Sequence, residues 1–230
     1  MRVGMFRTMA AAAALAVGLI GMAAPASAQT DVDVAFNVGV YSDYVFRGFS
    51  QTDEEAAIQG GVDLTAGGFY AGVWASNVDF GDDTDAEVDF YAGYRTEVSG
   101  FAVDGGVIAY SYVNAPNFAD YDYTEFKLAA SRAVGPATVG AAVYYSPSYL
   151  NEETVYYELN GGFSPVDKLS LSAAVGIQTY EDSEEYTTWN VGATYALIDN
   201  IAIDVRYHDT DVEDVPGAED RIVGALKFLF

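Results

Sequence analysis

Alternation of apolar and polar residues with a period of two runs through most of the chain and constrains its fold more than any other feature. In segment 201–208, for example, Ile203 and Val205 alternate with Asp204 and Arg206. A period of two is typical of β-strands with one apolar and one polar face. We predict twelve such strands, at residues 32–46, 56–66, 69–78, 87–98, 101–112, 123–132, 136–145, 154–163, 169–180, 186–197, 201–208 and 221–230.

The connections between these segments alternate between short and long. The short ones carry the Gly, Pro, Asn and Asp residues of tight turns and lie at 67–68, 99–100, 133–135, 164–168 and 198–200. The long ones lie near 47–55, 79–86, 113–122, 146–153, 181–185 and 209–220. This layout predicts an all-β fold, an antiparallel transmembrane β-barrel of about 12 strands with short periplasmic turns and longer extracellular loops.

The first 28 residues differ from the rest and predict a secretory signal peptide. Arg2 and Arg7 precede an apolar run at 9–22, and a small-residue cleavage site ends at Ala28. A retained membrane helix is the alternative, but this run is shorter than the roughly 20 apolar residues that such a helix needs. We therefore expect residues 29–230 to form one β-barrel domain in the cell outer membrane of a Gram-negative bacterium.

A soluble β-sandwich would also alternate, with its apolar face turned inward. The chain holds 18 Tyr against 13 Phe, however, and Tyr is favoured at membrane interfaces. Together with the signal peptide and the alternating connections, this favours the membrane barrel. Two aromatic girdles are predicted, with Tyr41, Tyr44, Tyr112, Tyr144, Tyr145, Tyr156, Tyr186 and Tyr207 at the outer strand ends and Phe69, Phe101, Phe163, Tyr195, Phe228 and Phe230 at the inner ends.

The overall charge limits the partners. Lys and Arg number 10 against 34 Asp and Glu, which gives a net charge of −24. Nucleic acid is excluded as a partner, because phosphate contacts need a basic patch. Cations would be attracted instead. The expected partners are outer-membrane lipid, small solutes or cations, and the barrel assembly machinery, which would bind the C-terminal strand ending in Phe230.

One stretch is more specific than the alternation. Residues 41–52 read YSDYVFRGFSQT. This motif resembles the opening of the TorF-type porins of proteobacteria, which are chains of similar size with a signal peptide, a barrel pattern and a terminal Phe. The resemblance implies an outer-membrane porin and fixes no solute.

Within this motif, Asp43 and Arg47 share strand parity and are predicted to face the lumen. Their separation is about 13 Å along a strand, so each would pair with charges on neighbouring strands. They are candidates for a constriction or selectivity pair. The alternative is a lumen salt-bridge network that locks the barrel, since charges in a narrow interior must be paired.

Further charges share the lumen parity, eight of them acidic and four basic. They are Asp63, Glu87, Asp89, Arg95, Glu97, Asp104, Glu125, Lys127, Glu158, Asp204, Arg206 and Lys227. The lumen is therefore predicted to be mixed but net acidic. Many glycines share the same parity, where they leave space or allow close approach of neighbouring groups.

Metal binding and catalysis have little support in the sequence. Asp209, Asp211 and Glu213 are spaced like calcium-loop ligands, but Asp214 stands where the loop needs Gly. The chain has no Cys, and its single histidine, His208, lies on a different predicted strand from Ser111. We expect no enzymatic activity, no cofactor and a solvated acidic rim.

Two functions follow from these observations. The first is an outer-membrane porin-like channel for passive diffusion of small polar or cationic solutes, because twelve strands lie between eight, whose side chains fill the interior, and sixteen, which leave a wide pore. The second is a structural or surface-interaction barrel whose lumen is plugged by its own charged side chains.

Overall fold

The computed structural model describes residues 32–116 and 119–230. The predicted signal peptide, residues 1–28, lies outside the described residues. Within the described part of the chain, no helix is long and apolar enough to cross a membrane.

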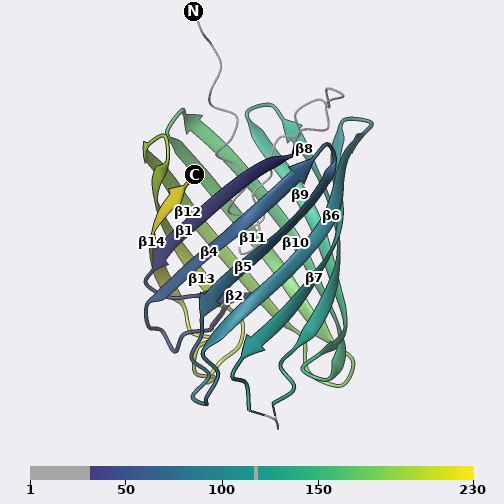
Figure 1. The fold of residues 1–230 in the computed structure, drawn as a ribbon, viewed down its shortest axis with the longest axis vertical. Coiled ribbons are helices and arrows are strands. Elements are labelled where there is room, and N and C mark those ends of the chain that lie inside the picture. Colours follow the sequence, from purple (N-terminus) through teal and green to yellow (C-terminus); the bar gives the residue numbers. More distant parts are fainter. Residues whose placement is uncertain (1–31, 117–118) are drawn as a thin grey trace, which may run out of the picture.

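Twelve antiparallel strands form one closed barrel, in which each strand pairs with its neighbours along the chain (Figure 1). These are β1 (Asp33–Tyr41), β4 (Ala57–Ala66), β5 (Phe69–Asn77), β6 (Ala86–Val98), β7 (Phe101–Val113), β8 (Tyr123–Val134), β9 (Ala137–Tyr149), β10 (Glu152–Val166), β11 (Leu169–Tyr180), β12 (Tyr186–Ile198), β13 (Ile201–Thr210) and β14 (Arg221–Leu229). A separate pair, β2 (Val45–Phe46) and β3 (Phe49–Ser50), forms a small second sheet. The predicted barrel and its strand number are confirmed.

The first and last strands close the barrel. β1 pairs with β14 from Asn37 opposite Leu229 to Tyr41 opposite Ala225. Beyond this ladder, Phe36 and Phe230 exchange backbone N–H···O bonds of 3.0 and 2.9 Å. Closure leaves no strand edge with unpaired backbone groups, which is the condition for a sheet surrounded by an apolar medium.

Short and long connections gather at opposite ends of the barrel, here named the turn end and the loop end. At the turn end, Ser99 and Gly100 both have positive φ, as a type I′ hairpin turn requires. In Figure 1 the chain ends near the upper, turn end, while the longer connections lie at the lower, loop end. The predicted alternation of connection lengths is therefore confirmed, with one exception.

The exception is the connection predicted at 146–153. β9 and β10 extend to Tyr149 and Glu152, so two residues, Leu150 and Asn151, make a tight turn with positive φ at both. Pro147 misled the prediction because proline breaks a central strand. It is tolerated here because β8 pairs with β9 only as far as Tyr145, so this side of β9 needs no further N–H donors.

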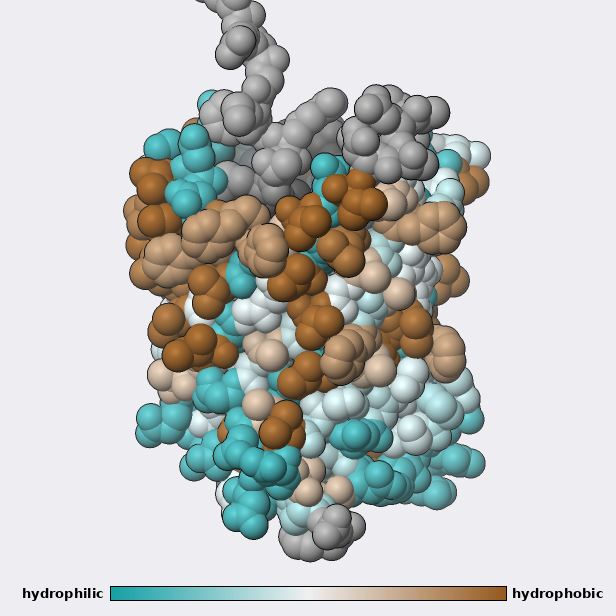
Figure 2. All heavy atoms as spheres, in the orientation of Figure 1, coloured by the Kyte–Doolittle hydropathy of each residue, from teal (hydrophilic) through white to brown (hydrophobic). Residues whose placement is uncertain are grey.

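Apolar side chains cover the outside of the barrel. On β1, for example, Val34, Phe36, Val38 and Val40 are exposed, and the other strands repeat this pattern. In Figure 2, apolar side chains spread over the middle of the visible face, and hydrophilic residues gather at the loop end. The charged side chains of alternate positions are buried inside, so the barrel has the opposite polarity of a soluble sandwich.

The predicted outer aromatic girdle is wrong in large part. Of its members, Tyr44 and Tyr156 are buried inside the barrel, and Tyr112 and Tyr144 are partly buried rings that pack against other lumen aromatics. The error came from assigning these tyrosines by their position near strand ends, although Tyr156 shares its parity with Glu158, a predicted lumen residue. The aromatic residues predicted at the turn end do face outward, with Phe69, Phe101, Phe163, Tyr195 and Phe230 exposed.

Several lumen glycines seat these rings and do not leave open space. A Cβ at Gly72 would clash with the ring of Tyr91, and one at Gly93 would clash with Tyr70 Oη and approach Gly105 O to 2.6 Å. Glycines that face outward are different, since a Cβ at Gly105 meets nothing within 4 Å. At these positions a tyrosine ring lies over a glycine of the wall and occupies the space that a larger side chain would take; we call this ring-over-glycine packing.

We predict that Gly93→Ala lowers the free energy of unfolding by about 1–3 kcal/mol, because Tyr70 and the facing backbone must move. The matched control is Gly105→Ala on the neighbouring strand β7. This substitution should leave the free energy of unfolding unchanged or raise it slightly. Urea-induced unfolding in detergent micelles measures both. Equal effects of the two substitutions would contradict ring-over-glycine packing.

Candidate functional site

The predicted first strand, 32–46, is wrong at its end. β1 stops at Tyr41, and residues 42–52 leave the wall, turn inward and form the β2–β3 pair, here named the lumen hairpin. Its Tyr44 and Val45 are both buried, whereas adjacent residues of a barrel strand face opposite sides. The run Tyr44-Val45-Phe46 interrupts the period of two, and this is the signal that the prediction passed over.

The hairpin turns at Arg47 and Gly48. Both have positive φ, of 47° and 93°, which gives the type I′ geometry of a two-residue hairpin turn. A Cβ at Gly48 would approach Thr188 Oγ1 to 2.7 Å and clash with the Thr210 methyl group. Glycine therefore serves both the turn and the close contact of the hairpin tip with β12 and β13.

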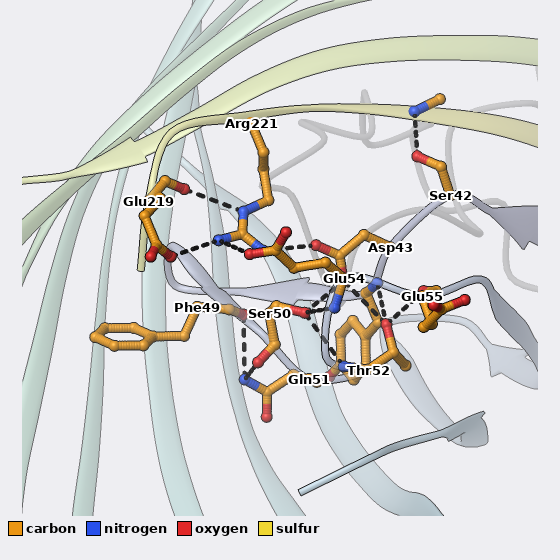
Figure 3. A network of polar contacts seen from close by, with 12 residues as sticks. Ser42, Asp43, Phe49, Ser50, Gln51, Thr52, Glu54, Glu55, Glu219 and Arg221 are labelled. Carbon is orange, nitrogen blue, oxygen red and sulfur yellow. Dashed lines mark hydrogen bonds and ion pairs between the residues drawn. The ribbon is translucent and has the colours of Figure 1, made fainter. Parts of the chain in front are cut away.

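Asp43 organises the base of the hairpin (Figure 3). Its Oδ1 accepts hydrogen bonds from Ser50 Oγ at 2.7 Å and Thr52 Oγ1 at 2.9 Å. Its Oδ2 pairs with the Arg221 guanidinium of β14 at 2.9 Å. Asp43 thus pairs with the strand next to β1, as the sequence predicted, and also closes the hairpin on itself.

Tyr44 attaches the hairpin to one side of the wall. Its hydroxyl donates to Glu87 Oε1 on β6 at 2.9 Å, and its ring contacts Trp74 of β5 edge-on at a centroid distance of 5.2 Å. The Phe46 ring contacts the Tyr110 ring of β7 edge-on, at a centroid distance of 6.0 Å.

Arg47 attaches the hairpin to the far side. Its guanidinium makes two parallel bonds to the Glu125 carboxylate of β8, at 2.7 and 2.9 Å, and a third to Gln178 Oε1 of β11 at 3.0 Å. The guanidinium carbon also lies 4.3 Å from the Tyr156 ring centroid and 5.3 Å from that of Tyr144. The prediction that Arg47 pairs with a neighbouring strand is wrong, because its partners lie across the lumen.

These contacts span the barrel from one side to the other. Trp74 lies on β5 and Glu87 on β6, while Tyr186 of β12, on the opposite side, donates its hydroxyl to Arg47 O at 3.1 Å. In addition, Ser50 N donates to Gly217 O at 2.8 Å. The lumen hairpin therefore crosses the lumen and narrows it at the loop end.

Three carboxylates lie beside the hairpin with a single close counter-charge. Glu87, Asp89 and Glu125 are each at least 98% buried, and Arg47 pairs with Glu125. Within residues 32–116 and 119–230, Asp89 Oδ1 has no hydrogen-bond partner. Because the burial of an uncompensated charge is costly, this cluster creates a strong local demand for a proton or a cation.

Six further charged side chains form two separate groups in the lumen. Asp104 pairs with Lys127 at 2.9 Å and Arg95 at 3.2 Å. On the other side, Asp204 lies 3.6 Å from Arg206 and 3.9 Å from Lys227. Each group combines one carboxylate with two bases, a formal excess of one positive charge, and cross-links adjacent strands.

The other predicted lumen residues stand apart from both groups. Asp63 accepts a hydrogen bond from Tyr91 Oη at 2.6 Å, and Glu158 accepts one from Asn160 at 2.7 Å. Glu97 is exposed at the turn end. The structure thus brings Asp43, Arg47, Asp89 and Glu125 to the level of the hairpin, whereas no hydrogen bond or ion pair within the described residues joins the hairpin to Asp63, Arg95, Glu97, Lys127, Glu158, Asp204 or Arg206.

Sequence reasoning missed several residues of this site. Gln178 has lumen parity, but its neutral side chain gave no signal. Tyr144 and Tyr156 were assigned to the outer girdle, and Arg221 was overlooked because it opens its strand. A small polar pocket, partly open to solvent, borders the hairpin tip and is lined by Val45, Phe46, Arg47, Gly48, Tyr110, Tyr144, Tyr156, Thr188, Asn190 and His208.

The spacing that resembles a calcium loop is used for hydrogen bonding. Asp211 accepts a bond from Thr187 N at 2.7 Å, and Asp209 accepts one from Tyr207 Oη at 2.9 Å. Across residues 32–116 and 119–230, no group of three acidic or histidine side chains is arranged to hold a metal ion. His208 is buried inside the barrel, whereas Ser111 pairs with the outward-facing Val88, so these two side chains lie on opposite faces of the wall.

We predict that Gly48→Ala displaces the lumen hairpin and exposes the bond after Arg47 to trypsin, because the added methyl group clashes with Thr210 and the positive φ is unfavourable. In the parent protein the buried Arg47 should resist cleavage. Mass spectrometry of the folded protein after mild digestion measures this. The control Gly224→Ala has open space and should stay resistant; cleavage of the parent at the same rate would contradict the buried hairpin.

Comparisons with known proteins agree with this fold. The KdgM porin superposes with a TM-score of 0.63 at 11% identity, covering 85% of this chain and 99% of that one. KdgM in complex with disordered oligogalacturonate gives 0.60 at 10% identity, and the NanC porin gives 0.56 at 10% identity, each covering 86% of this chain and 98% of the other. At this identity the likeness concerns the fold. No curated protein matches the chain by sequence.

A family relationship is visible in the sequence itself. Residues 24–225 match the family described as "Bacterial protein of unknown function (Gcw_chp)". This match spans most of the chain and all of the barrel up to its last strand. The protein therefore belongs to the Gcw_chp family of bacterial proteins.

Proposed function

We propose that this protein is an outer-membrane, porin-like channel through which small polar or cationic solutes diffuse passively, with the lumen hairpin setting the limit on their size. The observation that carries the proposal is a closed barrel that is apolar outside, charged inside and crossed by one hairpin.

The location follows from the surface. Exposed Val, Leu, Ile and Phe side chains around a closed barrel suit contact with lipid and not with water. The predicted signal peptide provides export, and the last strand with its terminal Phe230 provides the contact for the barrel assembly machinery. The turn end would then face the periplasm and the loop end the cell exterior. The motif that resembles the TorF-type porins forms the lumen hairpin, which supports a role of this hairpin in passage.

Charge supports cations as the preferred solutes. The lumen acids Asp63, Glu87, Asp89 and Glu158 have no ion-pair partner within the described residues, whereas each lumen base named above lies within 4 Å of a carboxylate. The oligogalacturonate described with KdgM is a chain of carboxylate-bearing sugars. A net acidic lumen in a chain of charge −24 disfavours such a polyanion.

A second function has support from one observation. The hairpin contacts wall strands on opposite sides of the lumen, which also fits a plugged barrel that serves as a structural or surface-interaction protein. The two functions differ in whether ions pass the hairpin.

Replacing residues 42–56 by an Asn-Gly turn should raise the single-channel conductance severalfold, because the hairpin that crosses the lumen is removed. The replacement is feasible since Tyr41 and Ala57 are directly paired partners on adjacent strands. Planar-bilayer recording of the refolded protein measures the effect. Shortening the acidic loop 181–185 in the same way is the control and should change conductance little. Absence of conductance in both the parent and the shortened hairpin variant would favour the plugged barrel.

We expect modest cation selectivity that weakens as the salt concentration rises, because loop charges are screened over about 8 Å at physiological ionic strength. Reversal potentials in a KCl gradient measure this preference. Arg47, Arg95, Lys127 and Arg206 oppose it. An anion-selective potential at low salt would show that these basic side chains control passage.

A further inference from the structure

We propose that the lumen wall contains a binding site for a guanidinium group, that Arg47 occupies this site as an internal ligand, and that solutes with a guanidinium or amidinium group compete for it. The inference rests on the proposed function where it names the solute class, but the binding site itself is independent of conduction.

The site belongs to the wall and not to the hairpin. Glu125 of β8 supplies both carboxylate oxygens, and Gln178 of β11 supplies an amide oxygen, so three acceptors converge on one planar cation. Two parallel N–H···O bonds are the geometry by which a carboxylate recognises a guanidinium, and an ammonium cannot reproduce it. The acceptors therefore specify the shape of the cation as well as its charge.

Aromatic rings from the wall complete the site. Tyr156 lies 4.3 Å from the guanidinium carbon, within the range of cation–π attraction, and Tyr144 lies 5.3 Å away. A Cβ at Gly176 would clash with the Tyr156 ring, so glycine at this position lets the ring settle against β11. Tyr110 donates its hydroxyl to Glu125 Oε2 at 3.0 Å and fixes the carboxylate. The rings and the carboxylate are thus held by contacts among wall residues, which are independent of the hairpin.

Electrostatics makes an empty site unfavourable. The Glu125 side chain is 1% exposed, and Gln178 is fully buried. Without Arg47 the carboxylate would be buried and unpaired beside Glu87 and Asp89, of which Asp89 Oδ1 has no partner within the described residues. A cation of matching shape that enters the site would relieve this cost.

Access is compatible with competition by a solute. The polar pocket reaches Arg47 and both tyrosine rings, and part of it is open to solvent. Arg47 is tethered through a short hairpin, so its effective concentration at the site is on the order of millimolar or higher. A free solute competes poorly against this tether, and removal of the Arg47 side chain should therefore reveal the intrinsic affinity of the wall.

The experiment compares the full-length parent with Arg47→Ala in detergent, using methylguanidinium as the probe and tetramethylammonium as the matched cation without N–H donors. Isothermal titration measures binding, the shift in melting temperature gives a second readout, and heat-modifiable gel migration verifies folding. We expect Arg47→Ala to bind methylguanidinium and to be stabilised by it. The parent should bind it at least tenfold more weakly, and tetramethylammonium should have no comparable effect.

Two further variants keep the test decisive. Adding Glu125→Gln to Arg47→Ala should weaken binding by about 30-fold or more, as expected when one partner of a buried charge pair is removed. If Arg47→Ala does not fold, the variant with residues 42–56 replaced by an Asn-Gly turn also vacates the site. A folded, vacated variant that does not bind methylguanidinium, binds both probes equally, or binds unchanged after Glu125→Gln overturns the proposal.

The outcome is separable from that of the channel function. Binding by the vacated variant without conductance in any variant would retain the site and reject the channel. Conductance without methylguanidinium binding would retain the channel and reject the site.

Discussion

Closure of the backbone hydrogen-bond ladder between β1 and β14 is the constraint on which the other features depend. In an apolar surrounding every N–H and C=O group must find a partner within the protein, and a closed barrel achieves this with no free edge. Closure with twelve strands also fixes the width of the interior. That width accommodates one additional two-stranded hairpin, so the segment after Tyr41 can span the lumen and reach strands on both sides.

Burial constrains the enclosed charges next, because a buried ion is costly unless it has a partner. The Asp104 and Asp204 groups each combine one acid with two bases, so each carries a formal excess of one positive charge. At the hairpin the balance is different, since one guanidinium faces Glu87, Asp89 and Glu125. The excess of carboxyl groups over bases is therefore concentrated at the level of the lumen hairpin, where it would act most strongly on an ion that passes the hairpin.

The sequence allowed prediction of the features that depend on local periodicity and failed for those that depend on contacts across the lumen. Strand parity placed Glu125 on the inner face correctly, because alternation is set by the backbone. It could not show that Arg47 meets Glu125, since 78 residues separate them along the chain and four wall strands, β4 to β7, lie between β1 and β8. Tyr144 and Tyr156 were assigned to a girdle from their position near strand ends, although Tyr156 shares the parity of the predicted lumen residue Glu158. The inward turn after Tyr41 left one trace, three bulky residues in succession.

The arginine at the hairpin tip has two roles. It holds the hairpin across the lumen, and its guanidinium is the group that the wall acceptors bind. A lysine could neutralise Glu125, but its ammonium would satisfy fewer acceptors and would stack less well on Tyr156. The tip residue adopts positive φ, which is uncommon for a residue with a side chain, and a residue there is retained only where its surroundings compensate the cost. Five contacts of the guanidinium, to one carboxylate, one amide and three rings, provide that compensation. The wall residues Glu125, Gln178 and Tyr156 thus match a guanidinium in shape and charge, and Arg47 at the hairpin tip supplies that group.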